Sequence, residues 1–271
     1  MKKRLTINKI ILALSTLSAL IGMGFLFWIL GTLMYKGLAT MHWDIFTKDL
    51  VNGGIRNLLV GQFVMAIIAT VIAVPLGVMA GIYLREYNSD GKISFVIRNL
   101  SDIMMSAPSI VIGVFVYALY VDRVGHFGGW GGIIALAIMM LPIIVSTTDN
   151  MLSLVPKELR EAGIALGGSK HKIILQIVLK AAKIGLTTGI LLSFARIVGE
   201  TAPLLFTSSN SQFFTLNLND QFPSLTVSIY NLATYPDQAS KDLAWAASFV
   251  LTVVVLVINL GGRYLTRNRK K

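Results

Sequence analysis

The chain has 271 residues, of which 55% are hydrophobic and 14% charged, and it contains no cysteine. Its mean hydropathy is +0.71. In soluble domains about a quarter of the residues are charged, so the low charged fraction argues against a soluble domain. The high hydrophobic fraction excludes a disordered chain. The absence of cysteine excludes disulfides, thiol catalysis and cysteine metal sites. His42, His126 and His171 are scattered over different segments, so we predict no histidine-based metal or catalytic site.

Long uncharged runs divide the sequence, and each is long enough at about 1.5 Å per residue to cross a hydrocarbon core of about 30 Å. We therefore predict an all-α integral membrane protein, with a single transmembrane domain over residues 1–271 and six spans. The predicted spans lie at approximately residues 10–34, 59–84, 103–121, 131–150, 184–206 and 243–262. The first run follows Met1-Lys2-Lys3-Arg4 and lacks a cleavage pattern, so we interpret it as a retained anchor. The fifth span is the weakest, because it contains two charged side chains.

The basic residues fall unevenly on the two sides that six spans define. Eighteen of the 24 lysines and arginines lie in the N-terminus, the second loop, the fourth loop and the tail, and five lie in the other loops. The positive-inside rule then places both termini in the cytoplasm. The net charge of +11 lies beside the membrane ends, where anionic lipid headgroups are found, so the lipid bilayer is the expected partner and nucleic acid is not.

Proline and paired glycine interrupt several spans. They are Pro75 with Gly77, Pro108, Pro142, and the run Gly199-Glu200-Thr201-Ala202-Pro203. Each weakens the helical hydrogen bonding, so we expect these helices to pack against protein or to line a cavity. The last connection, residues 207–242, is long enough to be a docking or lid element, and a disordered polar loop is the alternative.

The fourth loop, residues 151–183, is basic and patterned as two helices separated by a turn. Pro156 suits the start of a helix, and the glycine pair Gly167-Gly168 predicts its end. Apolar residues alternate with lysines after that turn and predict a second helix. Such a helix-turn-helix on the cytoplasmic face fits a soluble partner, and we call residues 151–183 the coupling loop.

This loop resembles that of the permease subunits of bacterial ABC importers, whose motif is E-A-A, three residues, G, nine residues, I-x-L-P. Here Glu161-Ala162-Gly163, Gly167 and the run Ile177 to Lys180 have that spacing. Gly163 and Lys180 depart from the motif. The resemblance implies that Glu161, Ala162, Gly163 and Gly167 contact an ATPase.

Further motifs are similar to those of the phosphate-specific permeases, in their PstA-type form. The matching segments are Gly53-Gly54-Ile55-x-Asn57, Ala73-Val74-Pro75-Leu76-Gly77, Tyr83-Leu84-Arg85-Glu86-Tyr87, Pro108-Ser109-Ile110-Val111-x-Gly113 and Ala195-Arg196-x-x-Gly199-Glu200-Thr201-Ala202-Pro203-Leu204-Leu205. The resemblance implies a six-span subunit of the bacterial cell membrane that pairs with a sister permease. Two ATP-binding subunits and an extracytoplasmic phosphate-binding protein, which delivers inorganic phosphate, are the other implied partners. The sequence has no phosphate-binding loop of the G-x-x-x-x-G-K-[ST] type, so we predict that another chain hydrolyses ATP and that this chain has no catalytic residues and no cofactor.

Arg196 and Glu200 are the candidate site within the fifth span. Each charge costs about 2.5–3.5 kcal/mol at the bilayer centre, whereas an i, i+4 pair contributes only about 0.2–0.5 kcal/mol. Pro203 disrupts the helix beside them, and Thr201 lies in the break. A guanidinium matches the oxygens of phosphate, so we predict that Arg196, Glu200, Thr201 and Pro203 lie on a phosphate path. A structural ion pair toward the sister subunit is the alternative.

Other functions remain open on the sequence alone. The chain could be the sister phosphate subunit or a permease for another oxyanion. From other classes, it could be an integral membrane enzyme or a signalling subunit, although Arg196 with Glu200 is the only charged pair at helical spacing within a span.

Overall fold

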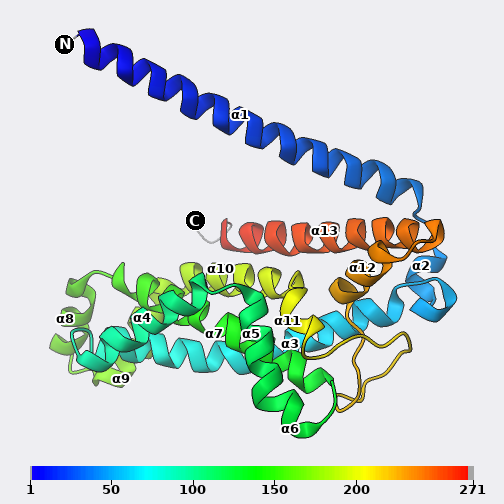
Figure 1. Cartoon of the computed structure of the whole chain (residues 1–271). Coiled ribbons are helices and arrows are strands. Elements are labelled where there is room, and N and C mark those ends of the chain that lie inside the picture. The colour runs from blue at the N-terminus through cyan, green and yellow to red at the C-terminus, as the bar shows by residue number, and fades with distance from the viewer. Residues whose placement is uncertain (1, 268–271) are drawn as a thin grey trace.

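A computed structural model describes residues 2–267, and all regular secondary structure in that range is helical, with no strand (Figure 1). The first half contains α1 (Lys2–Ala39), α2 (Asp44–Thr47), the short turn η1 (Leu50–Asn52), α3 (Arg56–Ile82), η2 (Tyr83–Tyr87), α4 (Lys92–Ser106), α5 (Ser109–Val116), η3 (Tyr117–Val121) and α6 (Asp122–Val124). The second half contains α7 (Gly129–Ser153), α8 (Lys157–Ala165), α9 (Lys170–Ile173), η4 (Ile174–Val178), α10 (Leu179–Val198), α11 (Ala202–Leu205), α12 (Leu225–Thr234) and α13 (Gln238–Arg267). The basic tail residues Arg269, Lys270 and Lys271 lie outside the described residues.

Five helices are long and apolar enough to cross a membrane, and a bent pair would be a sixth. The five are Ile7–Ala39, Arg56–Tyr87, Gly129–Ser153, Lys170–Val198 and Gln238–Tyr264. The interval 103–121, predicted as one span, is divided in the structure. Helix α4 and the helix Ser109–Val124 meet there at 105°. Pro108 lacks an N–H and disfavours the helical conformation of Ala107, whose ψ is 139°.

The predicted span 184–206 also differs. Its helix begins much earlier, at Lys170, and ends at Val198 instead of Phe206. Pro75 and Pro142, in contrast, lie inside continuous helices. Only two of the four predicted interruptions, at Pro108 and at residues 199–203, therefore break a helix.

Helix α7 is the centre of the bundle and packs between α3 and α10. On one side, a Cβ added to Gly77 or Gly81 of α3 would lie 2.7 Å from Ile144 Cβ and 2.5 Å from Thr148 Cβ of α7. On the other side, Gly185 and Gly189 of α10 lie against α7 in the same way. Small residues at four-residue spacing let helix backbones approach closely, which is how helices associate in lipid. The three helices thus form one closely packed unit.

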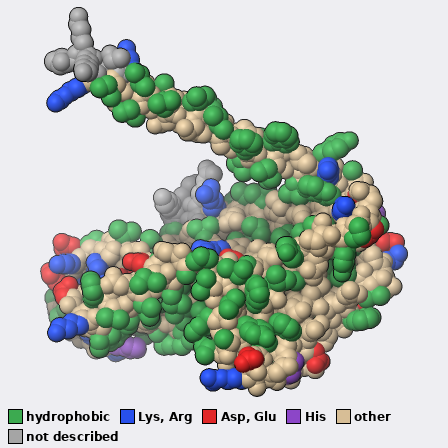
Figure 2. Space-filling view, in the orientation of Figure 1, with side chains coloured by type: hydrophobic (Ala, Val, Ile, Leu, Met, Phe, Trp, Pro, Cys, Tyr) green, Lys and Arg blue, Asp and Glu red, His purple; other side chains and the backbone are tan. Residues whose placement is uncertain are grey.

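Helix α1 diverges from this bundle (Figure 1). It contacts α13 near its C-terminal end, where Gly37 packs on Phe249 and Lys36 Nζ lies 4.8 Å from the Trp245 ring centroid. The rest of its length displays hydrophobic side chains on its visible surface (Figure 2), and its apolar window is entirely exposed. That exposure is typical of a helix whose surroundings are lipid or another membrane chain.

The connection 207–242 is only partly a loop. Residues 225–234 form α12, whose first four residues are buried, and α13 already begins at Gln238. The disordered-loop alternative is therefore wrong for this half of the connection. Asp237 precedes α13, and hydrogen bonds from Ser240, whose N–H lies 2.8 Å from the carboxylate, lower the pKa of this exposed carboxyl.

Candidate functional site

Helix α10 stops where the sequence predicts a break. Its last turn contains Arg196, Gly199 follows as the C-terminal cap, and the short helix α11 begins with Pro203 in its first turn. Residues 199–201 between the two helices are not helical, so backbone groups there need partners from other elements.

Arg196 and Glu200 face each other across this break. The Nε atom of Arg196 lies 3.5 Å from Oε1 of Glu200, a long contact for an ion pair. The side chain of Arg196 is 51% exposed, whereas that of Glu200 is 15% exposed. Within residues 2–267 the other donors of this guanidinium have no hydrogen-bond partner. The pair is therefore weak, and it leaves most of the guanidinium available to a ligand.

A buried amide fixes the backbone at the break. Gln62 of α3 donates from Nε2 to the carbonyl of Val198 at 3.0 Å, and its Oε1 accepts from the hydroxyl of Ser224 at 2.9 Å and from the N–H of Leu225 at 3.2 Å. Thr226 donates its hydroxyl to the carbonyl of Glu200 at 2.7 Å. Two carbonyls that the helix end leaves free are thus satisfied by side chains of α3 and α12.

Helix α5 supports the other side of the break. A Cβ on Gly113 would lie 2.7 Å from the Cα of Pro203, so only glycine permits this approach. The segment Pro108 to Gly113 and the segment Arg196 to Pro203, both singled out in the sequence, are therefore neighbours in space. Thr201 and Pro203 differ in access, since Pro203 is buried and Thr201 is half-buried.

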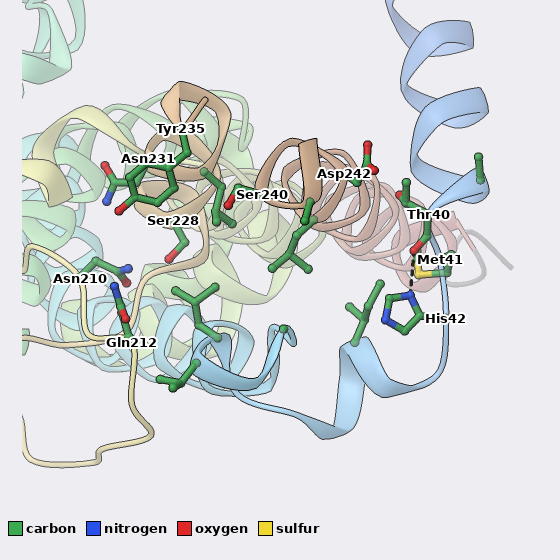
Figure 3. Close-up of a pocket in the computed structure, with 18 residues that line it drawn as sticks. Thr40, Met41, His42, Asn210, Gln212, Ser228, Asn231, Tyr235, Ser240 and Asp242 are labelled. Atoms are coloured by element: carbon green, nitrogen blue, oxygen red, sulfur yellow. Dashed lines mark hydrogen bonds between the residues drawn. The ribbon is translucent and has the colours of Figure 1, made fainter. Parts of the chain in front are cut away.

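A cavity of about 900 Å³ lies beside α2 and the start of α13 (Figure 3). Its polar lining includes Asn210, Gln212, Asn231 and Tyr235, and side chains of α1 and α13 complete it. This lining is mostly uncharged. Among the described residues, no three acidic, histidine or cysteine side chains gather as a metal site.

The coupling loop lies at the opposite end of the bundle. Helix α8 ends in a Schellman motif, in which the N–H of Gly168 bonds the carbonyl of Gly163 and the N–H of Gly167 bonds that of Ile164. Gly167 has φ = 77°, which confirms the predicted turn. Among the described residues, a Cβ at Gly167 would meet nothing within 4 Å. The requirement for glycine is conformational.

The two faces of α8 are different. Gly163 is buried against Ile173 and Ile177, whereas Glu161 and Ala162 are exposed. Several large apolar side chains in α8 and next to it in the sequence are also exposed, namely Leu154 (73% exposed), Leu159 (43%), Ile164 (64%) and Leu166 (90%). The second predicted helix is present, but it is the start of the continuous helix that includes α10, so the coupling loop and the fifth span are one rigid connection.

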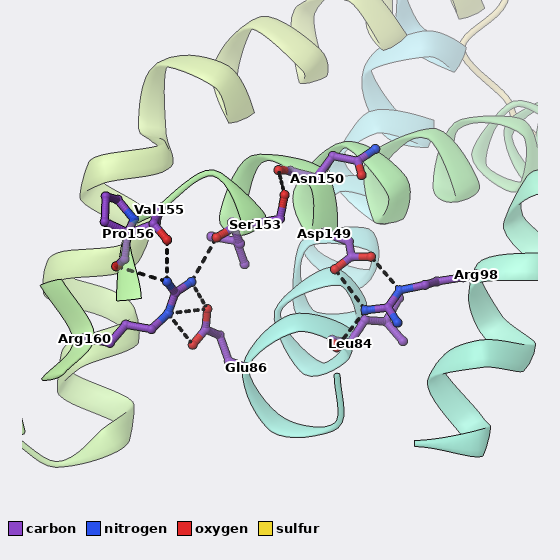
Figure 4. A network of polar contacts seen from close by, with 10 residues as sticks. Leu84, Glu86, Arg98, Asp149, Asn150, Ser153, Val155, Pro156 and Arg160 are labelled. Atoms are coloured by element: carbon purple, nitrogen blue, oxygen red, sulfur yellow. Dashed lines mark hydrogen bonds and ion pairs between the residues drawn. The ribbon is translucent and has the colours of Figure 1, made fainter. Parts of the chain in front are cut away.

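Two arginines tie this end together (Figure 4). Arg160 of α8 binds Glu86 of η2, with Nη2 2.6 Å from Oε1, and Arg98 of α4 binds Asp149 of α7, with Nε 2.7 Å from Oδ2. Arg98 also donates to the carbonyl of Leu84 at 3.2 Å. These pairs join residues 74 and 51 positions apart.

Sequence reasoning missed these ion pairs and Gln62. The pairs are long-range, so no local spacing reveals them. Gln62 did leave a signal, because a polar side chain within an otherwise apolar span needs a partner in protein.

Comparisons with known proteins agree with this architecture. A family model described as a binding-protein-dependent transport system inner membrane component matches residues 73–271. The phosphate transport system permease protein PstA of Haemophilus influenzae is 46% identical over 98% of this chain and 96% of its own length, and that of Yersinia pestis is 44% identical over 97% and 91%.

Two solved structures share the fold. The inward-facing methionine ABC transporter MetNI gives a TM-score of 0.65 at 21% identity, over 85% of this chain and 100% of that chain. A bacterial ABC transporter involved in the import of the acidic polysaccharide alginate gives 0.65 at 12% identity, over 94% and 95%. The chain belongs to the family of binding-protein-dependent inner-membrane transport components and is a multi-pass protein of the cell membrane.

Proposed function

We propose that this chain is the transmembrane permease subunit of an ATP-driven phosphate importer. The relatives that match nearly its whole length are PstA permease proteins of phosphate transport systems. The observation in the structure that carries the proposal is the half-exposed guanidinium of Arg196, held at the broken end of an apolar helix. A fork of donors in that position is suited to an oxyanion.

In this proposal phosphate passes along Arg196, Glu200, Thr201 and Pro203. Arg196 donates to phosphate oxygens, and Glu200 neutralises the guanidinium when phosphate is absent. The long 3.5 Å contact between them supports this role, because a weak pair exchanges readily for a ligand. Gln62 and Thr226 keep the break open by holding its two carbonyls.

Energy comes from other chains. Family membership implies ATPase and substrate-binding partners, and in the proposal these are two ATP-binding subunits and an extracytoplasmic phosphate-binding protein. A sister permease forms the other half of the pathway. The exposed side chains of Leu159, Ile164 and Leu166, with the exposed Glu161 and Ala162, support docking of an ATP-binding subunit. In the proposal the buried Gly163 and the turn at Gly167 hold α8 in position for that contact. Both termini are cytoplasmic, and this chain has no ATPase site of its own.

Phosphate uptake by cells that lack this chain, with and without its re-expression, tests the function. We expect re-expression to restore uptake of radiolabelled phosphate. Arsenate should compete, because its size, shape and protonation resemble those of phosphate, and sulfate should not. Restored sulfate uptake, or unchanged phosphate uptake, would contradict the substrate assignment.

A further inference from the structure

The guanidinium of Arg160 joins three elements at the coupling-loop end. Besides its bidentate contact with Glu86, it donates to the carbonyl of Leu152 at 2.9 Å and to that of Val155 at 2.7 Å. These carbonyls belong to the end of α7 and to the residues that follow it. One side chain of α8 is therefore bonded both to α7 and, through Glu86, to the helix that continues α3 (Figure 4).

The pair is shielded from water. The side chain of Glu86 is 7% exposed and that of Arg160 is 20% exposed. Desolvation makes a buried ion pair a weak source of stability, and apolar residues of similar size often stabilise a fold as well. The pair is therefore better suited to fixing the position of α8 relative to η2 than to stabilising the fold.

Two residues of α8, Gly163 and Arg160, contact different parts of the bundle. Gly163 packs on Ile173 and Ile177, which belong to the helix that leads directly to the break at residues 199–201. Arg160 leads instead to α3 and α7, which pack closely through Gly77 and Gly81. Movement of α8 along the first connection alone would displace α10 relative to α3. The second connection would make the two move together and would preserve the hydrogen bond from Gln62 of α3 to the carbonyl of Val198.

We propose that Glu86 and Arg160 are positioning residues for coupling, which transmit movement of α8 to α3 and α7. The inference rests on the proposed function, because it assumes that an ATP-binding subunit moves α8. It concerns a pair outside the coupling-loop motif itself. Loss of the pair should let α8 and α10 move with the ATP-binding subunit while α3 and α7 follow incompletely.

Glu86→Gln tests this in the complete complex, reconstituted in liposomes with its sister permease, ATP-binding subunits and binding protein. The variant keeps the size and an acceptor oxygen but removes the charge. We expect phosphate transported per ATP hydrolysed to fall about tenfold, within the range of coupling changes produced by residues that touch neither ligand. The ATPase rate and thermal stability should stay close to those of the wild type.

Asp149→Asn is the matched control. It removes the charge from the neighbouring ion pair, at a comparable distance of 2.7 Å, but Arg98 and Asp149 join α4 to α7 and do not involve α8. We expect its transport and ATPase rates to change in proportion, with an unchanged ratio. Glu86→Asp, which keeps the charge, should recover part of the ratio lost in Glu86→Gln.

The possible results distinguish failure of the coupling role from failure of the proposed transport function. An unchanged ratio in Glu86→Gln, or equal losses in Glu86→Gln and Asp149→Asn, would overturn the coupling role. Failure of both Glu86 variants to assemble would show a purely structural pair and would also overturn it. Absence of phosphate transport in the wild-type complex would contradict the proposed function instead.

Discussion

At the scale of single residues, the sequence shows where charged side chains lie within a span, but it does not show which partners a polar side chain binds. Arg196 and Glu200 stand out because charges are costly in an apolar run, and the structure does place them at a helix break. Gln62 is more deeply buried than either charge, but its signal in the sequence is weaker, because a neutral amide in a span is compatible with many neighbours. Its partners, Ser224 and Leu225, are more than 160 positions away.

Replacement of Gln62 should therefore be costly. Gln62→Leu leaves the Val198 carbonyl, the Ser224 hydroxyl and the Leu225 N–H without this partner, and all of them are at a buried site. We expect a loss of about 1–3 kcal/mol in the stability of the complex. Thermal unfolding of the purified complex measures it. Asn259→Leu, which removes a single bond within α13, is the control, and equal stability of the two variants would disprove the role of Gln62.

Gly167 provides a second residue-scale prediction. At φ = 77° a β-branched residue is strained by about 1–2 kcal/mol, whereas asparagine adopts this conformation more readily. We expect Gly167→Val to lose co-purification with the ATP-binding subunit and Gly167→Asn to keep it. Equal losses in both variants would mean that the partner, and not the backbone, requires glycine there.

At the scale of elements, the sequence predicts apolar helices well and their interruptions poorly. Pro75, Pro108 and Pro142 are equivalent signals, but only Pro108 ends a helix. The difference lies in tertiary packing, which the local sequence does not contain. Helices α3 and α7 support each other along a closely packed contact, whereas α5 turns away to support α11.

The close packing of α3 on α7 can be tested by introducing a larger side chain at the contact. Gly81→Leu would place a large side chain against Thr148, and overpacking of this kind costs about 1–3 kcal/mol. Gly261→Leu in α13, where a Cβ meets nothing within 4 Å, is the control. We expect a lower melting temperature only for the first variant. Comparable melting temperatures would contradict close packing of these helices.

At the scale of the whole molecule, the exposed apolar surface of α1 is typical of a helix surrounded by lipid or by another membrane chain. The orientation of the chain is a prediction from the distribution of basic residues. Because the chain lacks cysteine, Ser89→Cys, Ser169→Cys and Asn219→Cys can each be labelled with an impermeant thiol reagent in intact cells. We expect labelling only at Asn219→Cys. Labelling of Ser169→Cys from outside would contradict the predicted topology.

The central claim is that phosphate passes Arg196 at the break of α10. The direct measurement is phosphate uptake and ATP hydrolysis by reconstituted complexes that carry Arg196→Gln or Arg196→Lys. Loss of charge-assisted hydrogen bonds predicts about a hundredfold decrease in uptake for Arg196→Gln, with assembly and ATP hydrolysis retained, and a smaller decrease for Arg196→Lys, which keeps the charge but not the fork. Normal uptake by Arg196→Gln would contradict the claim, and failure of that variant to assemble would show a structural ion pair in place of a phosphate path.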